Sequence, residues 1–339
     1  MQSLPRTLRR PADEVGGRAR SIRRDPKRIA RRESVSTTTT QLTTHTLDVP
    51  GATLSYDIRR PDISTGDIGT GDIGTGDTST EPILLLIGFP MGATGFGTLA
   101  THFADRTVVT YDPRGTERSV ETAPTGRTPD GHADDLHRMI QAITRGPVDL
   151  FATSGGAVNA LVLVAKHPED VRTLVAHEPP LASILDDRDH ALAACQAVHE
   201  TYQRSGWGAG MAHFINIVSH RGPFTAELAS QPAPDPAMFG MPTEDDGSRN
   251  DPLLSQSVVT STHYEPDFDA LRTASTRIVV ATGEESEGEM ANRGAHAVAE
   301  RLGVEPVIFP SGHSGFLGGE YGQTGDPDAF AAKLRKVLQ

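Results

Sequence analysis

The chain has 339 residues, enough for one large domain with an inserted subdomain or for two ordinary domains, and therefore for a substantial core. Its hydrophobic content is 36%, and no apolar run reaches the length of about 18 residues that a membrane span needs, which argues against a membrane-spanning protein. The single cysteine, Cys195, excludes an internal disulfide framework and is consistent with a cytoplasmic location.

The charge is distributed unevenly along the chain. Residues 1–33 contain eleven Lys/Arg and four Asp/Glu, so they contribute +7 to the net charge of −12 and leave −19 on the remainder. So acidic a remainder is not expected to bind nucleic acid. The basic arm lacks aromatic residues and apolar periodicity, which favours a solvated, disordered tail over contact with RNA, DNA or an anionic membrane. We expect this arm and the following Ser/Thr-rich linker to cover residues 1–44.

Two features come before the main pattern of the chain. Alternating apolar positions on either side of Pro50-Gly51 predict a β-hairpin formed by Thr46–Val49 and Ala52–Ile58. A decaying Gly-Asp-Ile-Gly-Thr repeat then occupies residues 62–80, which we interpret as a flexible surface loop. Its aspartates match the spacing of no calcium-binding repeat.

Short apolar runs then alternate with helical patterns, which is typical of a parallel sheet with crossover helices. Helices are predicted over His132–Arg145, Val158–Lys166, Met290–Leu302 and Pro327–Leu338. The predicted strands are Ile83–Ile87, Thr107–Tyr111, Val148–Ala152, Val171–Ala176, Arg277–Ala281 and Pro306–Phe309.

The alternation stops between residues 181 and 275. Helical patterns occur at Leu185–Arg204 and Gly208–Ser219, but no convincing strand follows them. We therefore predict a helical cap at 181–275, inserted into a core formed by 45–180 and 276–339. A cap over one edge of the sheet shapes a pocket and excludes water from it.

A possible nucleophile follows the third strand of this run. The sequence Ala152-Thr153-Ser154-Gly155-Gly156 matches small-x-Ser-x-small at a strand-to-helix turn. Such a turn exposes the Ser154 hydroxyl, and its small neighbours let strand and helix approach closely. The N–H of Gly155, at the start of the helix, can stabilise an oxyanion. A plain Ser-Gly-Gly turn is the alternative interpretation.

Several motifs occur together in a characteristic order. They are Gly88-Phe89-Pro90, Asp112-Pro113-Arg114-Gly115, the serine turn, His177-Glu178-Pro179-Pro180 and Ser311-Gly312-His313. With these motifs, residues 45–338 resemble the α/β-hydrolase family, in particular its cofactor-free esterase, lactonase and haloperoxidase-like branch. The chain departs from that pattern at Ile87, where the usual residue is His, and at Ala152, where it is Gly.

The resemblance implies an α/β-hydrolase fold, with a mostly parallel central sheet, helices on both faces and a helical cap. It also places the second oxyanion donor at the N–H of Phe89. His313 is the expected general base, because it follows the last strand on a glycine-rich loop.

The acidic partner of His313 is less well defined. Relatives commonly carry Asp at the position that Ser286 occupies, so a shift of one residue favours Glu285. Glu178 is the alternative, because some members take their acid from the strand after the nucleophile helix. Glu284, Glu287 or the absence of an acid are the remaining possibilities.

Other residues near these motifs have two interpretations. Met91, Phe96 and Phe316 line a substrate pocket or belong to the ordinary core, and His177 is a pocket residue or a second choice for the base. Asp112 and Arg114 are expected to hold the loop beside the oxyanion turn, with Arg114 in a local ion pair.

The sequence thus predicts a serine hydrolase that cleaves small carboxylic esters or related acyl substrates without a cofactor. No His, Cys and Asp grouping has metal-ligand spacing along the chain. Two rival interpretations stay open. Gly92–Gly97 and Asp112 match part of a dinucleotide-binding pattern and suggest an NAD(P)-dependent oxidoreductase. The second rival interpretation is a hydrolase-fold receptor or signalling protein with little turnover.

Overall fold

The computed structural model describes residues 40–61, 81–122 and 127–339, all within one compact unit. The predicted arm, up to residue 39, and the predicted repeat loop at 62–80 lie outside the described residues. Within the described ranges, no helix is long and apolar enough to cross a membrane.

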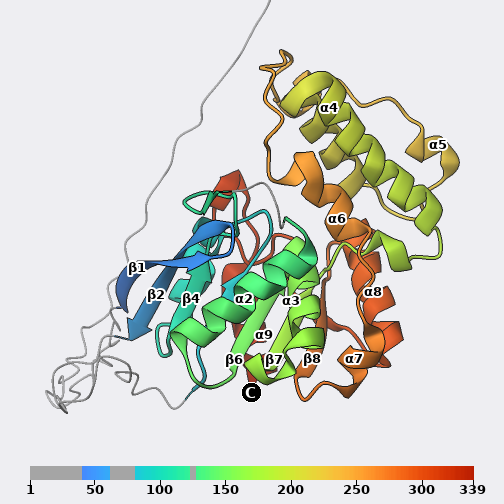
Figure 1. Ribbon diagram of the computed structural model, residues 1–339. Helices are drawn as coiled ribbons and strands as arrows, with labels where there is room; N and C mark the ends of the chain where they lie inside the picture. The colour runs from blue at the N-terminus through green and yellow to red at the C-terminus, as the bar shows by residue number, and fades with distance from the viewer. Residues whose placement is uncertain (1–39, 62–80, 123–126) are drawn as a thin grey trace, which may run out of the picture. The chain divides into compact units, whose positions relative to one another are not determined.

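A nine-stranded sheet forms the centre of this unit (Figure 1). The strands are β1 (Thr40–Val49), β2 (Ala52–Pro61), β3 (Leu84–Ile87), β4 (Val108–Tyr111), β5 (Val120–Glu121), β6 (Val148–Thr153), β7 (Val171–His177), β8 (Arg277–Gly283) and β9 (Val307–Phe309). Their order is β1-β2-β4-β3-β6-β7-β8-β9, and β5 pairs with β2. All pairs between β4 and β9 are parallel, whereas the pairs of β2 are antiparallel. All six strands predicted for the parallel sheet are confirmed.

Both faces of the sheet are covered, which explains the apolar runs in its strands. In β3, Leu84 and Leu86 pack into the apolar cluster on one face, and Leu85 and Ile87 into the cluster on the other. Successive side chains of a strand point to opposite faces, so all four are buried. A mostly parallel sheet with helices on both faces is therefore confirmed.

The amino-terminal hairpin is longer than predicted. β1 begins at Thr40, so the last part of the Ser/Thr-rich segment assigned to a linker belongs to the sheet. Thr40 pairs with Pro61, and the pairing continues residue by residue to Val49 and Ala52. The β-branched threonines fit a strand, and the backbone pairing to β2 decides their conformation.

The helices that cover the core are close to the predicted ones. α2 (Pro129–Ile143), α3 (Gly155–Lys166) and α8 (Met290–Leu302) cover one face, and α1 (Gly97–Thr101) and α9 (Pro327–Leu338) the other. α8 and α9 have the predicted bounds. α3 begins three residues earlier than predicted, directly after Ser154.

The inserted region contains helices and no strand of the sheet, as predicted. Its helices are α4 (Arg188–Val218), α5 (Ala226–Ala229) and α6 (Val258–Thr262), with a π-helical turn at Leu253–Ser257. α4 consists of two segments, because Gly206 has φ 81° and ψ −175°. These segments correspond to the two predicted helices. A side chain at Gly206 would strain the backbone and meet the carboxylate of Asp245.

The cap has its own apolar cluster, which includes Cys195, Tyr202 and Leu254. In the structure, the cap ends before residue 275, which was its predicted end. Phe268 and Leu271 of α7 (Phe268–Thr273) belong to the apolar cluster of the core, because α7 packs against α3. α7 is therefore a core helix.

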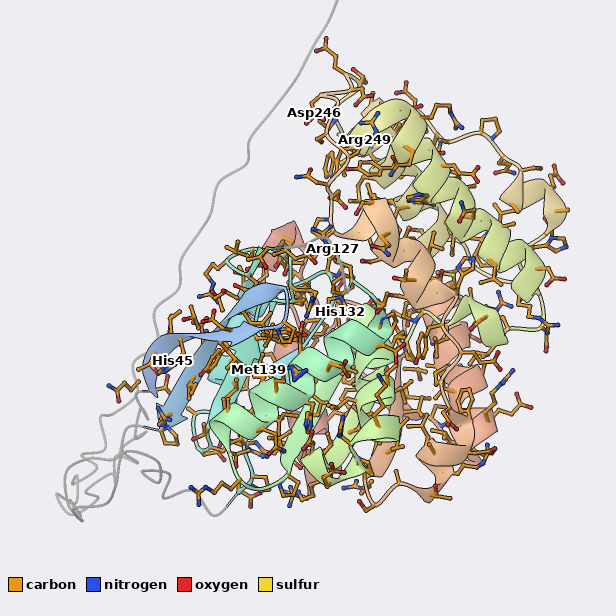
Figure 2. All side chains as sticks on the ribbon, in the orientation of Figure 1. His45, Arg127, His132, Met139, Asp246 and Arg249 are labelled. Carbon is orange, nitrogen blue, oxygen red and sulfur yellow. The ribbon has the colours of Figure 1, made fainter. Side chains whose placement is uncertain are left out.

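Arg127 connects the cap to the core (Figure 2). Its guanidinium lies 2.7 Å from the carboxylate of Glu121 in β5. It also donates to the carbonyl of Asn250 at 3.4 Å and to the hydroxyl of Ser255 at 3.5 Å. The carbonyl of Arg127 accepts a hydrogen bond from Thr260 of α6 at 3.2 Å. One core residue thus contacts three positions of the cap.

Candidate active site

Ser154 occupies a strained turn between β6 and α3. Its backbone has φ 57° and ψ −133°, a conformation that non-glycine residues adopt only when their surroundings enforce it. The Ser154 N–H donates to the carbonyl of His177 at 3.0 Å and fixes the turn to the end of β7. A Cβ at Gly156 would lie 2.8 Å from the backbone of Gly88, so α3 and the end of β3 approach too closely for any larger residue. The small residues of the motif serve this approach, as predicted.

Phe89 and Gly155, the residues whose N–H groups were predicted as oxyanion donors, are in contact. A Cβ at Gly155 would be 3.1 Å from both the ring and the carbonyl oxygen of Phe89. Neither the Phe89 N–H nor the Gly155 N–H donates to another group among the described residues. Gly155 is also the first residue of α3, where the helix dipole favours negative charge. Gly155, which directly follows Ser154, and Phe89, which touches Gly155, thus each have an N–H without a partner in the described part of the chain.

Glu178 is the carboxylate that contacts His313. Glu178 directly follows β7, has φ 49° and is fully buried, and its Oε2 lies 2.6 Å from Nδ1 of His313. The side chain of His313 is 35% exposed, so the imidazole extends from the buried carboxylate toward the surface.

Three further donors hold the other oxygen of Glu178. The N–H of Gly283 donates to Oε1 at 2.8 Å, the amide of Asn292 donates at 3.4 Å, and the Ser286 hydroxyl donates to the same atom. Burial by itself raises the pKa of Glu178, but the hydrogen bond from His313, the neighbouring imidazoles and Ser286 outweigh it and lower this pKa to about 2. The carboxylate is therefore ionised and fixed in orientation.

The first choice for the acid, Glu285, is not supported by this geometry. Glu285 is exposed, and its carboxylate accepts a hydrogen bond from the Ser311 hydroxyl at 3.2 Å rather than from His313. Glu284 and Glu287 are exposed as well, whereas Ser286 is the buried residue of this loop. Because the loop turns its serine inward, the carboxylate reaching His313 comes from the end of β7 instead.

His177 is not a pocket residue but a buried support beneath His313. Its Nδ1 lies 3.0 Å from the hydroxyl of Thr153, and its ring lies 5.9 Å from that of His313. Burial lowers its pKa to about 4, so the ring is neutral. Aromatic rings surround it, namely those of Phe151, Phe309, Phe316 and Phe330. His177 therefore lies too deep to act as the base.

The predicted apolar lining is also corrected in part. Phe96 and Phe316 are buried, with ring centroids 5.5 Å apart, and they pack in the core of one sheet face. Only Met91, which is partly buried against that cluster, remains a candidate for the lining. A cavity of about 340 Å³ opens beside His313, and polar residues line it, including Arg221, Glu289 and Thr324.

Asp112 and Arg114 have the structural roles that were predicted. Asp112 accepts the N–H of Ala93 at 2.8 Å and the guanidinium of Arg118 at 2.6 Å, and so holds the loop after β3. Arg114 makes two hydrogen bonds to Asp135 of α2. Both oxygens of Asp112 are occupied, which argues against the ribose contact of a dinucleotide-binding site.

Three residues of this region were not identified from the sequence. Two of them, Ser286 and Asn292, donate hydrogen bonds to Glu178. Ser286 stands where relatives carry Asp, and this position could have indicated that Ser286 contacts the acid. Figure 2 labels His132 on α2. This residue is buried, and its ring lies 4.6 Å from that of Phe89. Burial lowers the pKa of His132 to about 3, so it supports the oxyanion loop as a neutral ring.

His177, Glu178 and His313 each bring one potential metal-ligand atom within 4.8 Å of the others. The hydrogen bond between Glu178 and His313 and the burial of His177 explain this grouping without an ion. No hydrogen bond joins His313 to the Ser154 hydroxyl among the described residues, although both follow strands at the same sheet edge. An imidazole oriented by a carboxylate is in general able to activate a nearby nucleophile.

Comparisons with known proteins agree with this architecture. A sequence profile of the α/β-hydrolase fold matches residues 81–230. The uncharacterized hydrolase YraK of Bacillus subtilis is 31% identical over 278 residues, which cover 80% of this chain and 89% of YraK. Among solved structures, that of a thermophilic esterase from Thermogutta terrifontis matches with a TM-score of 0.55 at 19% identity. The match covers 88% of this chain and 98% of the esterase chain. The enol-lactonase of Burkholderia xenovorans also has a TM-score of 0.55, at 16% identity, covering 87% and 99%.

Proposed function

The chain belongs to the α/β-hydrolase family, and on that premise we propose that it is a serine hydrolase that cleaves carboxylic esters or related acyl compounds. The proposal depends on one observation above all, the hydrogen bond between Nδ1 of His313 and the buried carboxylate of Glu178. This bond fixes the orientation of the ring and leaves Nε2 as the basic nitrogen. Ser154 lies at the same edge, since its N–H is bonded to the residue that precedes Glu178.

In the first half of the proposed reaction, Nε2 of His313 takes the proton of the Ser154 hydroxyl as the oxygen attacks the ester carbonyl. The N–H groups of Phe89 and Gly155 stabilise the negative charge on the former carbonyl oxygen. Protonated His313 then gives its proton to the departing alcohol, the bond between the acyl carbon and the alcohol oxygen breaks, and an acyl-enzyme remains.

In the second half, water attacks the acyl-enzyme and His313 accepts one of its protons. The tetrahedral intermediate again places its charge at the same two N–H groups. Collapse releases the carboxylic acid, and the proton held by His313 returns to the Ser154 oxygen. Glu178 stays ionised throughout, and its charge stabilises the imidazolium form of His313 in both halves.

The decisive experiment combines turnover with active-site labelling. Wild-type protein should hydrolyse p-nitrophenyl butyrate and react with a fluorophosphonate probe at Ser154. Ser154→Ala should abolish both while preserving the circular dichroism spectrum. Ser183→Ala is a matched control, because Ser183 is a partly buried serine that bonds to the carbonyl of Tyr264. Unchanged turnover in Ser154→Ala would rule out this mechanism.

A further inference from the structure

A second group of potential metal ligands lies at the other end of β7. Asp170 directly precedes this strand, whereas Glu178 directly follows it. His137 of α2 and His167, which ends α3, meet Asp170 there. One ligand atom of each residue lies within 4.8 Å of the other two. The proposed hydrolysis makes no use of this group.

The three side chains converge in a defined geometry. Nδ1 of His137 lies 2.6 Å from Oδ2 of Asp170, and the rings of His137 and His167 stack with centroids 3.8 Å apart at 15°. Asp170 is only 2% exposed, and the amide of Gln141 donates to its other oxygen at 2.8 Å. Each imidazole is 29% exposed. The carboxylate is thus fixed, and both rings remain accessible to an ion.

This donor set suits a transition metal. Two imidazole nitrogens and one carboxylate oxygen are ligands that Zn²⁺ binds, with a fourth position left for water. One nitrogen of each ring lies within 4.8 Å of the other and of an Asp170 oxygen, so small side-chain rotations bring all three to a single ion. Gln141 would orient the carboxylate, as outer partners of metal ligands usually do.

The surrounding charge also favours a cation. Asp130 and Asp134 lie on the same face of α2 as His137, and Lys166 contacts both of them, at 2.6 and 3.5 Å. Glu169 lies 3.5 Å from His167. Together with Asp170, these residues provide four carboxylates on α2 and the segment after α3, and one lysine contacts two of them. An excess of negative charge raises the local concentration of cations.

We propose that His137, His167 and Asp170 bind Zn²⁺, and that the ion joins α2 to the turn that begins β7. The site is separate from the proposed catalytic residues and does not depend on the hydrolase mechanism. Its expected role is structural, since the ion adds a link between α2 and the short segment that joins α3 to β7.

The test uses the full chain, treated with EDTA and then freed of it. Calorimetric titration with ZnCl₂ should show one site per chain, and Zn²⁺ should raise Tm. Co²⁺ should give the visible absorption bands of a site with imidazole ligands. His137→Gln and His167→Gln should each weaken Zn²⁺ binding at least about tenfold, the loss that outer or direct ligand changes commonly cause. His102→Gln, a half-buried histidine beside Asp328, should bind like wild type.

Two results would overturn the proposal. One is the absence of stoichiometric Zn²⁺ binding in the wild type. The other is Zn²⁺ binding that both variants retain. If only His313→Gln then removed the binding, the ion would lie in the proposed catalytic site. If His137→Gln loses its fold, His167→Gln still decides, because the His167 ring makes no hydrogen bond among the described residues. Ester turnover is measured in parallel and should be unchanged in both variants at 25 °C.

Discussion

Oε2 of Glu178 lies 2.6 Å from Nδ1 of His313, across a separation of 135 residues in the chain. The carboxylate comes from the end of β7 and the imidazole from the loop after β9, with β8 between these strands. Because Oε1 is held by three donors of its own, Oε2 is directed at His313 alone. The expected consequences concern activity, stability and pH.

Replacing Glu178 with Gln should lower kcat strongly with little change in KM. The variant loses the negative charge that stabilises the imidazolium, and an amide N–H₂ cannot accept the Nδ1 proton. The comparable loss in a serine-histidine-aspartate triad is on the order of 10⁴-fold. Steady-state kinetics with p-nitrophenyl butyrate measure it. Glu285→Gln is the matched control and should retain wild-type kinetics; a larger loss in Glu285→Gln than in Glu178→Gln would reverse the assignment of the acid.

Ser286→Ala should decrease kcat about tenfold, since a hydrogen bond to a charged group contributes about 1.5 kcal/mol or more. The buried Ser286 hydroxyl donates to Glu178, so its expected role is positioning and KM should stay constant. Kinetics with two esters of different acyl length test this, because a positioning residue lowers kcat equally for both. A variant that changed KM for one ester only would indicate a role in substrate binding instead.

The stability of the protein should fall in acid partly through Glu178. Its pKa is lowered from 4.5 in the unfolded chain to about 2 in the folded protein, so the ionised carboxylate stabilises the fold above pH 4.5 and this contribution is lost as the pH falls toward 2. The largest possible contribution is about 3 kcal/mol. Urea unfolding of wild type and Glu178→Gln at pH 7 and pH 3 measures it. The difference between the two proteins should shrink at pH 3, and a difference that grew would contradict the lowered pKa.

Gly156→Ala should destabilise the fold by about 1–3 kcal/mol, as overpacking in a filled core usually does. The added methyl would meet the backbone of Gly88, which cannot move without shifting the oxyanion loop. Activity should therefore fall along with Tm. Gly146→Ala provides the control, because nothing lies within 4 Å of a Cβ at that position. Equal Tm values for the two variants would show that α3 and β3 have room to separate.

The sequence was sufficient to predict the six parallel strands, the four helices that cover them and the serine turn, because each has a local pattern. The apolar runs of the parallel strands indicate burial on both faces, and the small residues around Ser154 indicate a close approach of strand and helix. The acid could not be chosen in this way, because Glu285 and Glu178 both follow strands at the same sheet edge. Their difference is burial: the loop after β8 turns Ser286 inward and leaves Glu285 in solvent. That choice depends on packing between segments.

The aromatic residues near the motifs were misassigned for a related reason. Phe96 and Phe316 lie close to the site in sequence order, but their rings face each other inside the core. A pattern of apolar residues does not distinguish a filled interior from the wall of a pocket. The group of His137, His167 and Asp170 was missed for a different reason. His167 and Asp170 lie close together in sequence, but His137 comes from α2, 33 residues before Asp170.

The separate apolar cluster of the cap bears on how this enzyme can be re-engineered. A chimera that exchanges residues 185–262 for the corresponding part of a relative would leave the strands of the sheet intact. The graft must still match the contacts between cap and core, which include those of Arg127 with Asn250 and Ser255. Cys195 of the cap also lies against Met290 at the start of α8, with their sulfur atoms 3.8 Å apart. Asn292, which holds Glu178, is two residues further along that helix. A poorly fitted graft would therefore disturb catalysis through α8, while a well-fitted one would change selectivity alone.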